Sequence, residues 1–230
     1  MTVGPMHEAL KSVPLFAGLD DRELEALITV SRTRTYPKGR VIFSEGDPGE
    51  AFYLLLAGEV KVFRLGGNGQ ELILAWLQAG DFFGEMALFD GRPRSASVVT
   101  TEASTLLVLH KHELLTLVKT SGTMLSKCLT FLCKRLRDSD EKAADLALLE
   151  VDQRITKALL RMGEKIGVPG EAGALVITKR PTHQEFAGLV GASRETVTHV
   201  FNVLERQGYI SLRGRVVVLR KAFLERLNHL

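Results

Sequence analysis

The chain has 230 residues, 45% of them hydrophobic and 25% charged, which is ordinary for a globular protein of one or two domains. It contains no run of about 18 apolar residues and no apolar signal-peptide core near its start, so we expect neither a membrane span nor secretion. Its two cysteines, Cys128 and Cys133, do not make a disulfide framework, which favours a cytoplasmic location.

The formal net charge of +3 is unevenly distributed along the chain. Residues 1–151 hold 17 Lys and Arg against 20 Asp and Glu, whereas residues 152–230 hold 13 against 7. The first part is mildly acidic and the second is clearly basic. We therefore expect only the second part to meet a polyanion.

Residues 8–30 predict short helices, because their apolar residues fall at helical spacing. From residue 33 to 110, short apolar runs alternate with glycine-rich turn signals. This texture predicts an antiparallel β-sandwich or β-barrel. Within it, LGGNGQ (65–70) predicts a hairpin turn and not a nucleotide-binding glycine fingerprint, because the strand-to-helix setting is missing.

The stretch GEMALFDGRPRSA (84–96) places two opposite charges, Glu85 and Arg94, around a Gly-Arg-Pro turn. Such a loop suits a ligand that carries both hydroxyl groups and an anion. A carboxylate can accept a hydrogen bond from a hydroxyl, and a guanidinium can neutralise a phosphate. Backbone amides near Gly84 and Ala96 can add donors. The purely structural alternative is a turn closed by a Glu85–Arg94 salt bridge.

Residues 121–150 predict a long helix with a heptad seam, in which positions step by four and three residues. The seam comprises Leu125, Leu129, Leu132, Leu136, Ser139, Ala143 and Leu146. This spacing favours a helix packed along its twin in a homodimer, and the alternative is a helix lying on its own barrel. The polar member, Ser139, indicates either register control or a polar ligand. Cys128 and Cys133 lie about 140° apart around such a helix, so no metal site is expected from them.

The segment THQEFAGLVGASRETVTHVFNVLERQGYI (182–210) carries the signals of two helices joined by a tight turn. Thr182 and Glu185 form a capping box, Gly191 suits a left-handed turn, and Ser193 caps the second helix. These features predict a helix-turn-helix. A strand pair around RGR (213–215) adds a wing.

The second helix of this motif presents its N-terminal turns to a major groove. Arg194 can bond guanine, and Glu195 can accept from cytosine, while Thr198 and His199 point outward beside them. The wing residues Arg213 and Arg215 suit phosphates. The alternative is an ordinary helical hairpin with a charged exposed face.

Two of these motifs resemble those of a known family. FFGEMALFDGRPRSASV (82–98) is similar to the phosphate-binding cassette of cyclic-nucleotide-binding domains. GASRETV (191–197) is similar to the recognition helix of the cAMP receptor protein (Crp/Fnr) family of bacterial transcription factors. The resemblance runs from about residue 15 to 220. It implies an α+β fold with three parts: a jelly-roll β-barrel of cyclic-nucleotide-binding type with N-terminal helices (1–120), a long dimerisation helix (121–150), and a winged helix-turn-helix (151–230).

The resemblance also implies roles for single residues. Glu85 would bind the ribose, Arg94 and Ser95 the phosphate, Arg135 would point at the cassette, and Ser139 would bond the base. The expected nucleotide site comprises Gly84, Glu85, Met86, Arg94, Ser95, Ala96, Arg135, Ser139 and Asp140. The expected DNA contacts are Thr182, His183, Ser193, Arg194, Glu195, Thr198, His199, Arg213 and Arg215.

Two departures from the family pattern leave alternatives open. Asp140 stands where cAMP-responsive members often carry a second hydroxyl residue, and a carboxylate can accept from adenine or from guanine. We therefore expect cAMP as the effector, with cGMP or a ligand-free site as alternatives. His199 stands where the best-known members carry Arg. Arg194 and Glu195 imply a half-site similar to TGTGA, with the base facing His199 left open.

The sequence thus predicts a homodimeric transcription regulator in which a cyclic nucleotide re-orients two recognition helices on a two-fold symmetric site of double-stranded DNA. RNA polymerase is a further expected partner, and no membrane, metal or catalytic activity is expected. One alternative is a ligand-independent DNA-binding protein whose barrel is only a dimerisation scaffold. Others are a cyclic-nucleotide-gated enzyme subunit and a haem-sensing relative.

Overall fold

The computed structural model describes residues 3–11 and 13–225. The start of the predicted first domain, at residues 1–2, and the end of the predicted last domain, at residues 226–230, lie outside the described residues. The chain divides into two compact units, one of residues up to 66 and 73–138, the other of residues 67–72 and from 139 onward. The predicted domain boundaries at 120 and 150 stay predictions. Among the described residues, no helix combines the length and apolarity that a membrane crossing requires.

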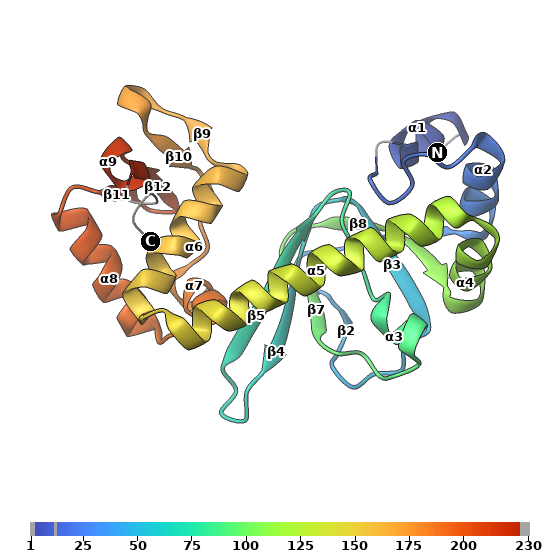
Figure 1. The fold of residues 1–230 in the computed structure, drawn as a ribbon, viewed down its shortest axis with the longest axis horizontal. Coiled ribbons are helices and arrows are strands. Elements are labelled where there is room, and N and C mark those ends of the chain that lie inside the picture. The colour runs from blue at the N-terminus through green and yellow to red at the C-terminus, as the bar shows by residue number, and fades with distance from the viewer. Residues whose placement is uncertain (1–2, 12, 226–230) are drawn as a thin grey trace. The chain divides into compact units, whose positions relative to one another are not determined.

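The first unit contains two four-stranded sheets, with strand orders β1-β8-β3-β6 and β2-β7-β4-β5 (Figure 1). Its elements are α1 (Val3–Lys11), α2 (Asp21–Val30), β1 (Arg32–Tyr36), β2 (Val41–Phe43), β3 (Ala51–Ala57), β4 (Glu59–Leu65), β5 (Glu71–Gln78), β6 (Phe82–Phe83), α3 (Met86–Asp90), β7 (Ser97–Thr100), β8 (Ser104–His110) and α4 (Lys111–Thr120). The predicted antiparallel jelly-roll type of fold is confirmed, with its strands arranged as two stacked sheets. The predicted hairpin turn lies between β4 and β5.

Strand β3 is almost entirely apolar, and it buries side chains on both of its faces. Successive side chains of a strand point to opposite faces. Phe52 and Leu54 therefore pack into a core with the N-terminal helices, while Leu55 packs into the core between the two sheets. The sheet that contains β3 is thus a middle layer, with helices on one face and the second sheet on the other.

Helix α5 (Gly122–Leu148) is a continuous helix of 27 residues (Figure 1). It buries Met124 and Cys128 against the first unit. The leucines of the predicted seam lie on another face, and four of them are exposed, namely Leu125, Leu129, Leu136 and Leu146. The seam is therefore not the face that α5 packs on its own β-domain.

The second unit consists of helices around a four-stranded sheet of order β11-β12-β10-β9. Its elements are α6 (Val151–Ile166), β9 (Val168–Pro169), η1 (Glu171–Gly173), β10 (Leu175–Ile177), α7 (His183–Val190), α8 (Arg194–Arg206), β11 (Ile210–Arg213), β12 (Val216–Leu219) and α9 (Lys221–Leu224). Helices α7 and α8 are the predicted helix-turn-helix, and β11 and β12 form the predicted wing.

The last turns of α5 are joined to α6 by ion pairs. Lys157 Nζ lies 2.6 Å from Asp145 Oδ1, and Arg161 pairs with Glu141. Arg154 of α6 also donates hydrogen bonds to the backbone carbonyls that follow α5 and end α7. The end of α5, α6 and α7 are therefore tied together within the second unit.

Candidate functional site

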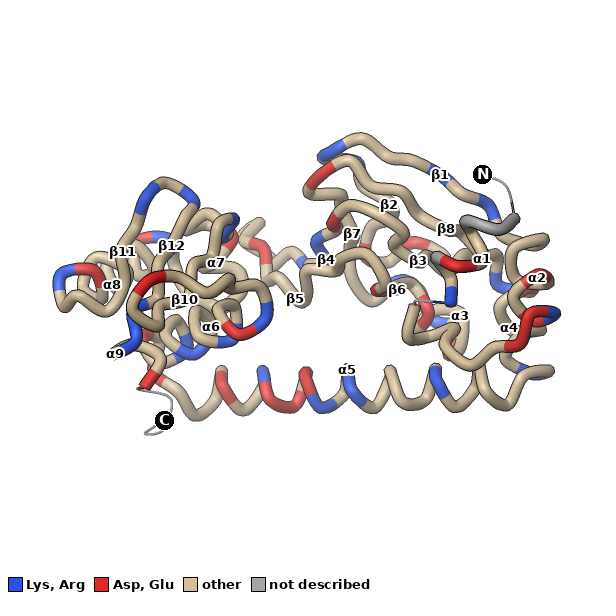
Figure 2. The backbone as a smooth tube through the Cα atoms, turned by 90° about the horizontal axis from the view of Figure 1, so that it is seen from above, with Lys and Arg blue, Asp and Glu red and all other residues tan. Residues whose placement is uncertain are grey.

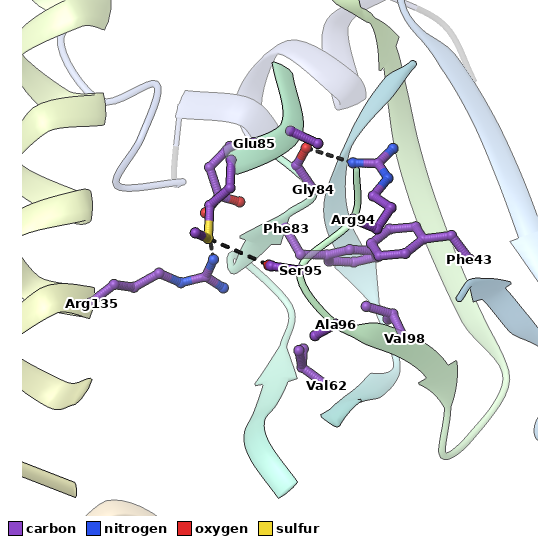
Figure 3. Close-up of a pocket in the computed structure, with 12 residues that line it drawn as sticks. Phe43, Val62, Phe83, Gly84, Glu85, Arg94, Ser95, Ala96, Val98 and Arg135 are labelled. Atoms are coloured by element: carbon purple, nitrogen blue, oxygen red, sulfur yellow. Dashed lines mark hydrogen bonds and ion pairs between the residues drawn. The ribbon is translucent and has the colours of Figure 1, made fainter. Parts of the chain in front are cut away.

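A hollow in the first unit lies where β6, α3 and the start of β7 meet (Figure 3). It is lined by residues 83–87 and 94–96 with Phe43, Val62, Val98 and Arg135. Gly84 turns the chain from β6 into the cassette at φ +84°, and a Cβ there would lie 2.7 Å from the guanidinium of Arg94. Only glycine suits that position.

Glu85 is 1% exposed, and its two carboxylate oxygens differ in environment. Oε1 accepts a hydrogen bond of 2.6 Å from Nη1 of Arg135, which reaches over from α5 (Figure 3). Oε2 is buried and has no hydrogen-bond partner among the described residues. A buried carboxylate oxygen without a donor is unfavourable. One carboxylate oxygen of a residue that lines the hollow is therefore left without a donor among the described residues.

Arg94 is 5% exposed, and its guanidinium is bound to backbone. Its terminal nitrogens donate hydrogen bonds of 2.7 Å to the carbonyl oxygens of Gly84 and Ala51. Its Nε is buried without a partner among the described residues. Burial lowers the pKa of Arg94 from its ordinary value. The salt-bridged turn between Glu85 and Arg94 is not what closes the cassette, since Glu85 pairs with Arg135 instead.

Two aromatic rings lie beside the Arg94 guanidinium, and a third packs against both of them. The guanidinium carbon is 4.2 Å from the ring centroid of Phe43 and 5.9 Å from that of Tyr53. Tyr53 stacks on Phe83 with an interplanar angle of 8°. A cation over an aromatic face is attracted by the ring quadrupole, and more strongly where water is excluded. The ring cluster therefore holds the charged group beside the hollow.

The other predicted cassette residues differ in position. Ala96 is buried, whereas Met86 and Ser95 are exposed, and the Ser95 hydroxyl lies 3.7 Å from the sulfur of Met86. Ser139 and Asp140 are exposed on α5 and belong to the second unit, whereas the lining residues belong to the first. Their contact with a base stays a prediction.

The helix-turn-helix has the predicted local geometry. Thr182 and Glu185 form a reciprocal capping box at the start of α7. Gly191 adopts φ +65° at the turn, and the Ser193 side chain accepts from the backbone of Thr196 at the start of α8. These caps satisfy backbone amides that the helices leave unpaired. They fix where α8 begins and which side chains its first turns present.

The side chains predicted to contact DNA fall into two groups. Arg194, Glu195, His199 and Arg213 are exposed, and Figure 2 shows basic residues at the turn between β11 and β12. His183 and Thr198 are half-buried, and their polar atoms, His183 Nδ1 and Thr198 Oγ1, lie 2.8 Å apart. The Thr198 hydroxyl is thus engaged by His183, and its expected contact with DNA stays a prediction.

Arg215 is also engaged within the protein. Its Nε donates to the carbonyl oxygen of Arg180, and its guanidinium lies 3.8 Å from the Glu185 carboxylate. Arg180 is buried, and it donates to the carbonyl oxygens of Pro181 and Gly214 at 3.0 Å. Arg180, Phe43 and Tyr53 carry no local motif that marks them in the sequence, because most of their partners lie far away in the chain.

A β-domain with a buried acid and a buried guanidinium at one hollow, followed by a winged helix-turn-helix, defines a ligand-responsive DNA-binding regulator. Family models agree with both parts: residues 33–121 match the cyclic nucleotide-binding domain, and residues 153–227 match the Crp-like helix-turn-helix domain. The chain belongs to the CRP/FNR family of bacterial transcription regulators.

The relatives extend over nearly the whole chain. A Mycobacterium tuberculosis protein named CRP-like cAMP-activated global transcriptional regulator is 32% identical over 214 residues, 93% of this chain and 95% of that protein. The cyclic AMP receptor protein of Thermus thermophilus is 36% identical over 215 residues, 94% of this chain and 96% of its own. The c-di-GMP responsive regulator CLP of Xanthomonas campestris has a TM-score of 0.77 at 30% identity, covering 87% of this chain and 99% of that chain.

Proposed function

We propose that the hollow of the first unit binds cAMP and that this binding controls DNA recognition by the second unit. One observation carries the proposal: Glu85 Oε2 and Arg94 Nε are both buried without a partner among the described residues, and both side chains line the same hollow. An acceptor and a cationic donor at one site complement a molecule that has a hydroxyl and an anion. A cyclic nucleotide has both.

In this proposal each cassette residue has one role. Glu85 accepts from the ribose 2′-hydroxyl through Oε2 while Arg135 holds Oε1. Arg94 and the exposed hydroxyl of Ser95 donate to the phosphate. The base then extends toward α5, where Ser139 lies four residues after Arg135 and therefore on the same face of the helix. Asp140 beside it can accept from the amine of adenine or from guanine. The names of the relatives favour cAMP over cGMP.

We further propose a homodimer in which α5 packs along its twin. The exposed leucines of the seam recur at heptad spacing over roughly three repeats, and such a stripe is stable in water only when covered. A two-fold dimer presents two recognition helices to a two-fold symmetric site. We expect such a regulator to act in the cytoplasm without catalytic activity, with RNA polymerase as its partner at promoters.

Control of DNA binding requires that cAMP bind one state of the dimer more tightly than another. The coupling is then reciprocal, so that specific DNA also tightens cAMP binding. This reciprocity separates an effector from a passive ligand. A barrel that serves only as a scaffold would show neither effect.

Calorimetry with cAMP, cGMP and c-di-GMP tests the proposal, followed by DNA binding with each nucleotide. We expect heat and a rise in melting temperature with cAMP, and tighter binding to a selected duplex in its presence. No heat with any nucleotide, together with unchanged DNA affinity, would favour the ligand-independent regulator. Deletion of residues 182–220 should abolish DNA retention while nucleotide binding persists.

A further inference from the structure

His183, the first residue of α7, packs on the recognition helix α8. Its Nδ1 lies 2.8 Å from the hydroxyl oxygen of Thr198, and its ring centroid is 5.1 Å from that of Phe201. Phe201 is fully buried and also meets Phe186 edge-on. The imidazole therefore links the start of α7 to the first turns of α8 through one polar and one aromatic contact.

The hydrogen-bond network assigns the proton on this imidazole. The Thr198 hydroxyl has one hydrogen, and its oxygen lies 2.9 Å from the carbonyl oxygen of Arg194, which can only accept. We infer that the hydroxyl donates to Arg194 and accepts from His183, which assigns the hydrogen to Nδ1 and leaves a lone pair on Nε2. Nε2 is buried without a partner among the described residues.

The charges around the ring favour its neutral form. Burial is the largest influence, and Arg180 and Arg194 act in the same direction, so that the pKa of His183 is lowered. The guanidinium of Arg180 lies 5.4 Å from the ring centroid of Phe201, and the carbonyl oxygen of Arg180 accepts a hydrogen bond from Arg215. The acid on α7, Glu185, caps its own helix. A second proton would create a buried Nε2–H donor beside two cations.

We propose that His183 is a positioning residue for DNA reading: its neutral imidazole holds the Thr198 hydroxyl and thereby fixes the turn of α8 that presents Arg194 and Glu195 to the bases. The proposal rests on the DNA-reading role of α8. It assigns His183 to sequence specificity, whereas a direct contact with a phosphate would contribute to all DNA binding equally. The two roles predict different results.

A matched pair of substitutions separates the roles. In His183→Asn the amide nitrogen is as many bonds from Cα as Nδ1 is, so it can still donate to Thr198. In His183→Gln the amide reaches the place of Nε2 instead. The probes are a duplex selected by the unsubstituted protein from a random pool and a random-sequence duplex of equal length.

We expect His183→Gln to lower the ratio of specific to non-specific affinity by about tenfold and His183→Asn to keep it within about threefold. Non-specific affinity should be the same in all three proteins. If both substitutions instead weakened binding to every duplex and reduced the salt dependence by about one phosphate contact, His183 would be a backbone contact and the proposal would be wrong.

A double-mutant cycle tests the contact itself. Thr198→Val removes the acceptor and keeps the side-chain shape. We expect Thr198→Val to cause the same loss of specificity as His183→Gln, and the double substitution to cause no further loss. Fully additive losses would overturn the proposal, because they would show that the two residues act independently.

Nitrogen NMR of the imidazole gives a test without DNA. We expect hydrogen on Nδ1 at neutral pH and titration below the usual range of histidine. Because the folded pKa is lowered, the unfolded chain binds protons more readily, and stability contributed by neutral His183 is lost as pH falls below about 6.5. Hydrogen on Nε2, or titration at the ordinary pKa, contradicts the proposal. Failure to select any duplex would instead count against the DNA-reading role of α8.

Discussion

One carboxylate oxygen of Glu85 lies 2.6 Å from the guanidinium of Arg135, so an ion pair connects the cassette to the long helix 50 positions further along the chain. The pair engages only one of the two carboxylate oxygens of Glu85. The remaining oxygen is buried without a partner among the described residues, and both Glu85 and Arg135 line the hollow. In the proposed binding mode, one side chain therefore contacts both the ligand and the long helix.

Glu85→Gln keeps the shape of this side chain and removes its charge. Because a hydrogen bond to a charged group contributes more than one to a neutral group, we expect cAMP binding to weaken by about 10- to 100-fold. The ratio of affinities for cAMP and 2′-deoxy-cAMP should fall toward one, measured by calorimetry. An unchanged ratio would show that Glu85 does not meet the ribose hydroxyl.

Phe43→Leu removes the ring beneath Arg94 while keeping an apolar side chain. A desolvated cation–π contact contributes up to about 2 kcal/mol, so we expect cAMP affinity to fall by about 3- to 30-fold. Phe63→Leu is the control, because Phe63 lies under Lys61 and not under Arg94. Equal effects of both substitutions on affinity would contradict a role for Phe43 in holding Arg94.

The sequence could predict features that depend on neighbouring residues, but not those that depend on contacts between residues far apart in the chain. Thr182, Gly191 and Ser193 act on backbone within a few residues, so the helix-turn-helix and its boundaries were predictable. The direction in which the Arg94 side chain points was not predictable. One of its acceptors is the backbone carbonyl of Ala51, which is 43 positions away, and a backbone carbonyl leaves no pattern in the sequence. The pattern of charges around the cassette indicated a ligand site, but not that Arg94 binds backbone.

The same reasoning applies to the DNA-reading unit. Thr198 lies four residues after Arg194, so helical spacing places both on the face of α8 that is expected to meet DNA. Its engagement by His183 depends on how α7 crosses α8, a tertiary relationship that helical periodicity does not contain. The exposed seam of α5, by contrast, follows from spacing within one helix, and the sequence predicted it.

Leu136→Asp tests the seam as a dimer contact. Leu136 is 62% exposed in the single chain, so the substitution should leave the protomer folded. In a packed seam it would bury an unpaired charge, so we expect dissociation to monomers in sedimentation experiments. Leu148→Asp is the control, because Leu148 is 80% exposed and lies outside the seam. A dimer that persists in Leu136→Asp would place the interface elsewhere.

Arg194→Ala tests direct reading of a base. We expect a loss of about 1–3 kcal/mol on the selected duplex and relaxed preference at one base pair. Arg206→Ala, in the last turn of the same helix, controls for loss of positive charge. A uniform loss over all sequences would identify Arg194 as a phosphate contact.

The two cysteines should differ in reactivity. Burial raises the pKa of the Cys128 thiol to about 11, whereas Cys133 is exposed on the same helix. Because the thiolate is the reactive form, a disulfide reagent at pH 8 should modify one thiol rapidly and the other only after unfolding. Cys133→Ser should remove the rapid phase. Two equal rates would contradict the burial of Cys128.

The ion pairs of Lys157 and Arg161 with Asp145 and Glu141 have a consequence for how the chain can be divided. A fragment begun at residue 151 would leave Lys157 and Arg161 without these carboxylate partners, and Arg154 without the carbonyl of Leu149. The transferable module, whether excised by an experimenter or exchanged by recombination between genes, begins inside the long helix and carries its last two turns along.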